Sequence, residues 1–175
     1  MSETPEDLEA IAVSVERGDD PYVVPEELLV EPAKDAPVNK SLYAQILLMK
    51  VGERIKLALR GNRDARMILI RDGNRIIQRF VLRNPRISDE EVIAVARNRN
   101  ADADLLRVIG DHKNWSRNYQ VRLGLVTNPK APLAIALHFV NGLAERDLRA
   151  LGKSKNVSAT VVAQARRLLA QREQR

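Results

Sequence analysis

The chain has 175 residues, long enough for one domain with a sizeable core, and a net charge of +6. It contains no cysteine, which excludes disulfides, thiolate zinc sites and a cysteine nucleophile. Aromatic residues make up only 3% of the chain, so the core must be built from Leu, Ile, Val and Ala, which suits closely packed small helices and argues against a β-sandwich.

Residues 1–38 differ in composition from the rest of the chain. They hold five of the eight prolines and 11 acidic residues against two basic ones, a net charge of −9, whereas residues 39–175 carry +15. Dense proline and acid predict a largely disordered arm, 1–38, ahead of a basic helical-repeat domain, 39–175. Two apolar clusters, over residues 8–15 and 22–30, could dock on that domain or on a partner.

The sequence shows no targeting or membrane signal. Residues 1–6 lack the basic and apolar regions of a signal peptide. No apolar run approaches the ~18 residues that are needed to span a bilayer. We therefore expect a cytoplasmic protein with no membrane partner.

Helical spacing begins near residue 41, where apolar residues recur at i, i+4 and i+7. Gly52 interrupts this pattern, which then continues to a helix stop of the glycine type at residue 61. A further helix is expected over about residues 63–71. The chain then breaks at Asp72, which is the expected N-cap of the next helix, and that helix ends at about residue 83.

An Asn-Pro pair followed by a short apolar helix occurs twice, at Asn84 and Asn128, 44 residues apart. Degenerate copies begin at Asn98 and Asn156. The pair ends one helix because the residue before proline avoids the α conformation. Recurrence of one local unit is the sign of a stacked helical-repeat architecture.

A cap for the next helix follows each of these asparagines. Ser88 is expected to cap its helix in a capping box with Glu91. Asp102 and Ser158 are the expected caps of two later helices, while Pro132 fits the first turn of another. With linking helices over residues 116–126 and 144–151, the chain has about nine helices of roughly 8–13 residues. Each is too short to be stable alone in water, so stacked neighbours must stabilise it.

The Asn-Pro pair followed by a capped helix resembles the HEAT-like superhelices and the leucine-rich-repeat-variant proteins, over about residues 50–170. The stretch from Glu53 to Asp72 looks like uncharacterised bacterial helical-repeat proteins. This resemblance implies an all-α fold, a short right-handed α-solenoid of about nine helices. It also implies a binding role, with no established activity to carry over.

Arginine recurs at three- to five-residue spacing before the first Asn-Pro pair. Arg75, Arg79 and Arg83 lie one helical turn apart and drift by only about 40° per step, so they form one ridge. The planar guanidinium fork suits phosphate or carboxylate groups. This ridge, extended by Arg71 and Arg86, is either an anion-binding surface for nucleic acid or acidic protein, or a solvated helix face.

A local aromatic cluster forms a second candidate binding surface. Trp115 and Tyr119 are flanked by three bases, which are Lys113, Arg117 and Arg122. Single large aromatic residues usually serve packing. We therefore expect Trp115 to pack into the neighbouring repeat instead of forming a platform for a base or ligand.

No residue set has the identity and spacing of a catalytic, metal or cofactor site. His112 and His138 are the only histidines and lack further ligands at metal-site spacing. Asp102 and Asp104 stand at a helix N-terminus, where carboxylates stabilise the helix dipole. Glycine-rich phosphate loops are missing. We expect no catalytic residue, no metal and no cofactor.

The main functional hypothesis is a non-enzymatic adaptor that holds a protein or peptide partner on its Arg-rich surface. The alternative is a DNA- or RNA-binding protein that uses the same basic face, with the acidic arm as an intramolecular mimic. An enzymatic alternative, by likeness in class to helical-repeat DNA glycosylases, would need Asp111 and Trp115 to line a pocket. The oligomeric state stays open.

Overall fold

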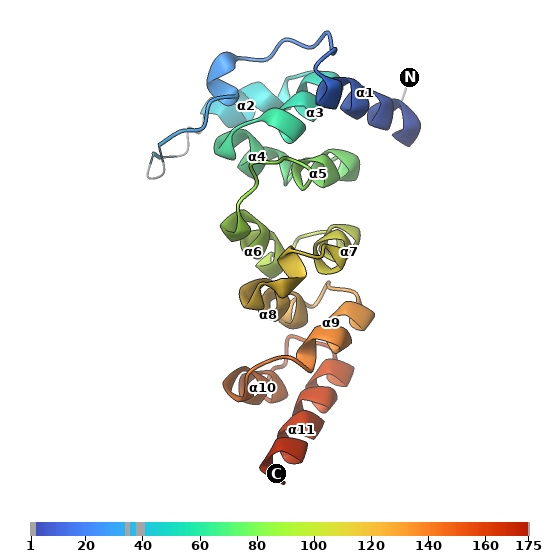
Figure 1. Cartoon of the computed structure of the whole chain (residues 1–175), viewed down its shortest axis with the longest axis vertical. Coiled ribbons are helices and arrows are strands. Elements are labelled where there is room, and N and C mark those ends of the chain that lie inside the picture. The colour runs from blue at the N-terminus through green and yellow to red at the C-terminus, as the bar shows by residue number, and fades with distance from the viewer. Residues whose placement is uncertain (1–2, 34–35, 38–40, 175) are drawn as a thin grey trace. The chain divides into compact units, whose positions relative to one another are not determined.

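The structure is a computed structural model that describes residues 3–33, 36–37 and 41–174. Within these residues the chain forms eleven α-helices and two short 3-10 helices, and no strand (Figure 1). The expectation of an all-α protein is confirmed. The expected count of about nine helices is too low, because one helix lies within the proposed arm and because residues 48–50 separate two helices. Gly52, where the interruption is expected, lies inside the second of these helices.

The helices form two compact units that divide after Ser88. The N-terminal unit contains α1 (Pro5–Arg17), η1 (Glu26–Leu28), α2 (Ser41–Leu47), α3 (Val51–Arg60), α4 (Arg63–Leu69) and α5 (Arg75–Val81). The C-terminal unit contains α6 (Asp89–Arg97), α7 (Ala103–Asp111), η2 (Trp115–Arg117), α8 (Tyr119–Thr127), α9 (Leu133–Val140), α10 (Glu145–Gly152) and α11 (Ala159–Glu173). The composition instead suggested a boundary between residues 38 and 39.

Residues 5–17 form α1, so the expectation of a disordered arm is wrong for them. Pro5 occupies the first turn, where proline is tolerated. Thr4 caps the helix: its hydroxyl accepts from the Asp7 N–H (3.2 Å), and the Asp7 carboxylate accepts from the Thr4 N–H (2.9 Å). Gly18 ends the helix in the left-handed conformation, with φ 80°. The buried face of α1, which packs against α3, consists of Leu8, Ala12 and Val15.

The second apolar cluster of the proposed arm also docks on the N-terminal unit. Leu28 of η1 is fully buried in the core that α3 forms with α1, α4 and α5. The ring of Tyr22 lies against Gly52 near the start of α3, where a Cβ atom would come within 2.2 Å of the ring. Gly52 therefore permits the close approach of this segment.

Two of the expected helix caps are confirmed and one is wrong. Asp102 caps α7 and Ser158 caps α11, each by accepting a backbone N–H of the first turn. Asp72 does not cap α5, because Asn74 takes that position. The Asp72 carboxylate instead accepts from the guanidinium of Arg54 (2.6 Å) and from the Asn74 N–H (2.8 Å).

The C-terminal unit is built around α8, which packs against α6, α7 and α9, while α11 packs along α9 and α10. Two glycines bring helices together. A Cβ atom on Gly124 of α8 would lie 3.1 Å from the side chain of Ala96 on α6. One on Gly110 of α7 would lie 2.9 Å from Ile135 on α9. The two expected linking helices are present as α8 and α10.

The two Asn-Pro pairs share one structural role. Asn84 and Asn128 are 1% and 4% exposed. The Nδ2 of Asn84 donates to the carbonyls of Ala58 (3.0 Å) and Gly61 (3.1 Å) at the end of α3. The Nδ2 of Asn128 donates in the same way at the end of α6, to two carbonyls at 2.8 and 3.0 Å. Each asparagine thus satisfies one carbonyl in the last turn of a helix, that of Ala58 or Ala96, which the helix leaves without a partner.

The degenerate copies of the Asn-Pro unit do not share this role. Asn156 is exposed, and Asn98 supplies one of the carbonyls that Asn128 binds. Asn62, which the repeat pattern does not include, is the third buried asparagine of this kind. Its Oδ1 accepts from the Ala65 N–H (3.0 Å), and so it caps α4.

Candidate partner-binding surfaces

The N-terminal unit binds the carboxylate of Glu31 with three groups. The Oε1 atom accepts from Nη1 of Arg66 (2.6 Å), and Oε2 accepts from the backbone N–H of Arg63 (2.9 Å). The Nε atom of Arg86 lies 3.7 Å from Oε1. Burial opposes the charged form of Glu31, but the hydrogen bonds from Arg66 and Arg63 outweigh it, so the pKa of Glu31 lies below its ordinary value. Glu31 is therefore held ionised.

The backbone of the same segment is held through its carbonyl groups. Nδ2 and the backbone N–H of Asn62 donate to three carbonyls within residues 27–30, at 2.7–2.9 Å. Nη1 of Arg86 donates to the remaining carbonyl of this stretch (2.8 Å). Nη2 of Arg63 donates to the carbonyl of Ala36 (2.9 Å). Arginine and asparagine side chains thus bind this segment, which forms η1 and the turn after it, by its main chain as well as by its charge.

Other acidic residues near the N-terminus pair with bases of the body. Arg83 donates to the carboxylates of Glu9 (2.6 Å) and Glu16 (2.7 Å) of α1. Lys56 donates to Asp20 (2.9 Å). Burial opposes ionisation of Asp20, yet the hydrogen bond from Lys56 outweighs it, and the pKa of Asp20 is lowered. We call residues 19–33, which contain Asp20 and Glu31, the acidic segment.

The expected arginine ridge is divided by these contacts. Arg71 follows α4, Arg75 begins α5 and Arg79 lies in its last turn, and all three are exposed. Arg83 and Arg86 instead engage Glu9, Glu16 and Glu31, as described above. Part of the predicted anion-binding surface is therefore occupied by the chain's own acidic residues.

Trp115 is a packing residue, as expected for a single large aromatic side chain. It is 9% exposed, and its ring stacks on His112 with 3.8 Å between centroids and 24° between planes. The His112 Nδ1 atom also accepts from the Trp115 backbone N–H (3.4 Å). A ring held in this way offers no open face on which a base could stack.

The bases around Trp115 differ in their surroundings. Lys113 and Arg117 are exposed, whereas Arg122 is half-buried with its guanidinium 5.6 Å from the centroid of the Tyr119 ring. The Tyr119 hydroxyl donates to Asp147, and burial together with this hydrogen bond raises the pKa of Tyr119. Tyr119 therefore links α8 to α10, and Arg122 lies over its ring.

Net charge is divided unequally between the two units. Up to Ser88 the chain has 14 basic and 14 acidic residues, so the N-terminal unit is neutral. From Asp89 onward it has 15 basic and 9 acidic residues, so the C-terminal unit carries the entire +6. The negative charge of residues 1–38 is therefore balanced by bases of the same N-terminal unit, on which the acidic segment docks.

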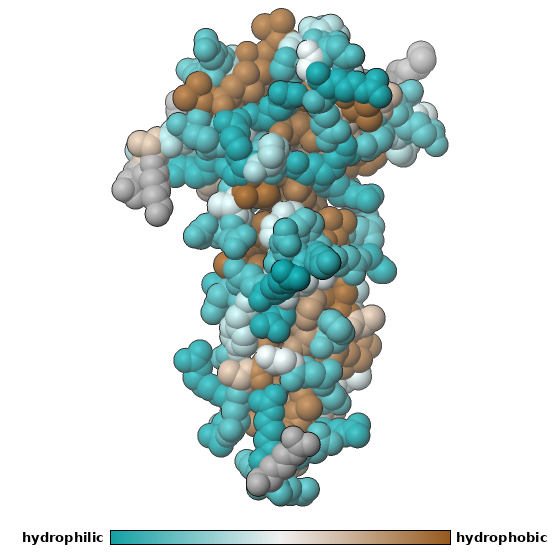
Figure 2. Space-filling model, viewed as in Figure 1, coloured by the Kyte–Doolittle hydropathy of each residue, from teal (hydrophilic) through white to brown (hydrophobic). Residues whose placement is uncertain are grey.

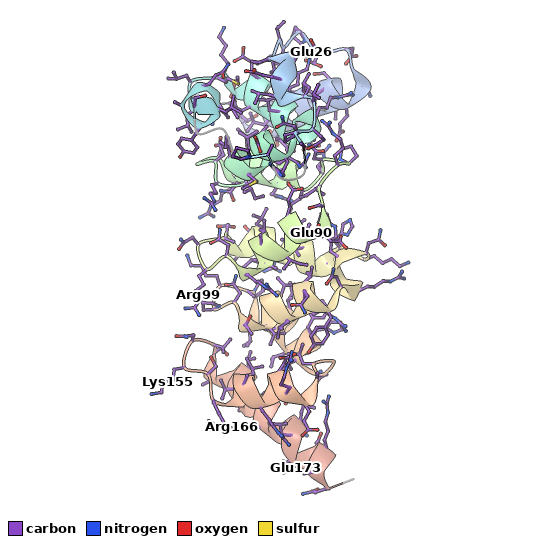
Figure 3. All side chains as sticks on the ribbon, turned by 90° about the vertical axis from the view of Figure 1, so that its left-hand side faces the viewer. Glu26, Glu90, Arg99, Lys155, Arg166 and Glu173 are labelled. Atoms are coloured by element: carbon purple, nitrogen blue, oxygen red, sulfur yellow. The ribbon has the colours of Figure 1, made fainter. Side chains whose placement is uncertain are left out.

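Four exposed bases of the C-terminal unit lie in its loops, namely Arg99, Lys130, Lys153 and Lys155. The loops after α6 and α8 are adjacent, because Asn128 donates to the carbonyls of Ala96 and Asn98. Figure 3 shows Arg99 and Lys155 on the same side of this unit. We call the four bases and their loops the loop edge. The four bases are far apart in the sequence, so the spacing of charges along the chain does not identify them. They become apparent only when the net charge is counted for each compact unit.

Most exposed large apolar side chains of the described residues lie in the N-terminal unit. They are Val23, Val30, Tyr43, Leu47, Leu48 and Met67, and the C-terminal unit adds Leu133. Figure 2 shows apolar residues among hydrophilic ones on the visible face of the N-terminal unit. The surface chemistry of the two units therefore differs in both charge and hydropathy.

Comparisons with protein-family models, with curated proteins and with solved structures find no match to this chain. The resemblance to HEAT-like proteins therefore stays a prediction. In the described part of the chain, no group of three or more His, Asp or Glu side chains converges as metal ligands would. No helix among the described residues combines the length and the apolar character needed to cross a membrane.

Proposed function

We propose that the protein is a non-enzymatic helical-repeat adaptor that holds an acidic segment of a protein partner on basic loops. The observation that carries this proposal is the binding of its own acidic segment. Arg66 and Arg86 meet the Glu31 carboxylate, while Asn62 and Arg86 donate to the carbonyls of residues 27–30. Such a combination suits a peptide, which offers carboxylates and main-chain carbonyls together.

The proposal includes the helical arrangement. We propose that short helices stack as a right-handed α-solenoid of the HEAT-like kind, whose extended surfaces typically serve binding. Its support is the recurrence of the buried asparagine, since Asn84 after α5 and Asn128 after α8 make equivalent contacts to α3 and α6. Helices of 7–10 residues, as α3 to α8 are, also depend on neighbours for stability.

Binding of DNA or RNA is the second candidate function, and the net charge of +6 on the C-terminal unit favours it. The state of the two aromatic rings favours a protein partner instead. Trp115 is buried and the Tyr119 hydroxyl is engaged by Asp147, so neither ring forms a stacking platform. Phosphate attraction also accompanies any strongly basic surface and so discriminates poorly between partners.

Fluorescence anisotropy with two labelled probes tests the proposal. One probe is a peptide with the sequence of residues 19–33, and the other is a single strand of about six nucleotides, which carries a similar number of charges. We expect the full-length protein to bind the peptide more tightly than the oligonucleotide at about 150 mM salt, where exposed charges are largely screened beyond about 8 Å. Tighter binding of the oligonucleotide, with a steep loss on adding salt, would overturn the adaptor proposal.

A further inference from the structure

We infer that the loop edge of the C-terminal unit is the docking surface for an extended acidic segment of a partner protein. This inference rests on the proposed function and gives it a location. It starts from the equivalence of the two Asn-Pro loops. Arg86 and Lys130 both stand two residues after the buried asparagine, and the backbone N–H of each donates to that asparagine's Oδ1 at 2.9 Å.

The two equivalent bases differ in what surrounds them. In the N-terminal unit, Arg86 lies against the Glu31 carboxylate and donates to the carbonyls of Leu29 and Arg60. In the C-terminal unit, Lys130 is exposed, and its ammonium makes no ion pair or hydrogen bond with any residue that the structure describes. The position that an acidic peptide fills in one unit is therefore open in the other.

The neighbouring loops add positive charge to the same place. Arg99 follows α6, whose last carbonyls bind Asn128, and Lys153 and Lys155 follow α10. All three bases are exposed, and within the described ranges none has a side-chain ion pair. Figure 3 shows Arg99 and Lys155 pointing outward on one side of the unit. A single extended segment that follows this side can meet several bases in succession.

Most carboxylates of the C-terminal unit lie away from the loop edge. The carboxylates of α6 and α10 stand in the first turn of each helix. The length of the helix, about 12–13 Å, therefore separates them from the loop that follows it. Asp102 and Asp104, by contrast, begin α7 and lie next to the loop that carries Arg99. The Asp102 carboxylate is engaged as a cap by the Asp104 N–H (2.9 Å). The loop edge therefore has an excess of positive charge.

The surroundings of these bases suit a peptide better than a nucleic acid. Exposed asparagines, Asn100 and Asn156, flank the bases and offer both donors and acceptors to a peptide main chain. The three aromatic residues of the C-terminal unit, Trp115, Tyr119 and Phe139, are buried or half-buried, so stacking of bases is not provided for.

Charge removal in the full-length protein tests the location. The loop-edge variant carries Arg99→Ser, Lys130→Ser and Lys155→Ser. The control carries Arg107→Ser, Arg146→Ser and Arg167→Ser, which removes equal charge from exposed positions of the same unit that lie outside both candidate surfaces. With the labelled peptide of residues 19–33, we expect the Kd of the loop-edge variant to rise about tenfold, since each exposed ion pair contributes about twofold to threefold. The control should change by less than about twofold.

The outcomes separate the inference from the proposed function. Equal weakening in both variants, or none in the loop-edge variant, overturns the location and leaves the adaptor proposal standing. Absence of peptide binding to the unaltered protein overturns both. Oligonucleotide binding that depends on the loop edge while the peptide does not bind assigns the surface to nucleic acid. A dimer of the unaltered protein that the loop-edge variant loses identifies a second copy as the occupant and overturns a separate partner.

If the serine variants unfold, the location can be tested instead by reversing the charges on both the protein and the peptide. In a Lys130→Glu, Lys155→Glu protein, the acidic peptide should lose binding, and a peptide with its acidic residues replaced by lysine should gain it. Circular dichroism melting of each variant checks that the fold is retained. Failure of the exchanged peptide to bind a folded variant would overturn the inference.

Discussion

The carboxylate of Glu31 lies 2.6 Å from the guanidinium of Arg66, whose side chain is only 3% exposed. A buried arginine is costly without a partner of opposite charge, and here the partner comes from a segment 35 residues earlier in the chain. The acidic segment is thus part of the folded N-terminal unit, and its removal would uncover a buried cation.

Replacement of this carboxylate should destabilise the protein. In Glu31→Gln, the buried guanidinium of Arg66 keeps its bond to the Gly61 carbonyl (3.1 Å) but loses its ion pair with the Glu31 carboxylate. We expect the free energy of unfolding to fall by about 1–3 kcal/mol, measured by urea denaturation. Glu27→Gln is the control, because the Glu27 carboxylate is exposed, and a loss of stability there of the same size would contradict this account.

Acid should weaken the docking of the acidic segment. The pKa values of Glu31 and Asp20 are lowered from the ordinary 4.5 and 3.8, so the unfolded chain takes up protons at a higher pH than the folded one. Their contribution is complete above these ordinary values and is lost as the pH falls through the lowered ones. Urea midpoints should therefore decline below about pH 4.5, and more steeply than in a Glu31→Gln, Asp20→Asn variant. Parallel curves for the two proteins would refute this cause.

Each Asn-Pro asparagine should be essential for stability. Asn84→Ala leaves the carbonyls of Ala58 and Gly61 without this donor, and Asn128→Ala does the same at the end of α6. We expect each change to cost about 2–3 kcal/mol in thermal or chemical unfolding. Asn156→Ala, at an exposed position of a degenerate copy, should cost less than about 0.5 kcal/mol. Similar losses for Asn84 and Asn156 would show that burial of the amide is unimportant.

The contact between Tyr22 and Gly52 can be tested by a double-mutant cycle. Gly52→Ala places a methyl group where the Tyr22 ring lies, within 2.2 Å, and should destabilise the protein by about 1–3 kcal/mol. In a Tyr22→Ala background the same change should cost much less, because the clash is removed. Equal costs in both backgrounds, measured by urea denaturation, would mean that the two residues do not meet.

Local signals predict much of the fold. The apolar spacing and the caps at Asp102 and Ser158 place α7 and α11, and the Asn-Pro pairs mark the ends of α5 and α8. The composition of residues 1–38, rich in proline and acid, predicts disorder, although the sequence also contains a specific signal for a helix. Thr4 and Asp7 form a capping box, and Gly18 provides a helix stop.

The candidate site is less accessible to sequence reasoning. The ridge of Arg75, Arg79 and Arg83 follows from helical spacing, but the contacts of Arg83 with Glu9 and Glu16 join residues far apart in the chain. Charge periodicity along one helix carries no information about such partners. The loop edge likewise depends on how loops are brought together, which the spacing of bases along the chain does not contain.

Because the first 88 residues are electrically neutral and the remainder holds all of the excess charge, long-range attraction acts on only one half of the molecule. An approaching polyanion is steered toward that half before any contact forms, and its encounter rate should drop as ionic strength rises. The other half has no net charge and so adds little to this long-range attraction, and capture should begin at the carboxyl-terminal half of the chain.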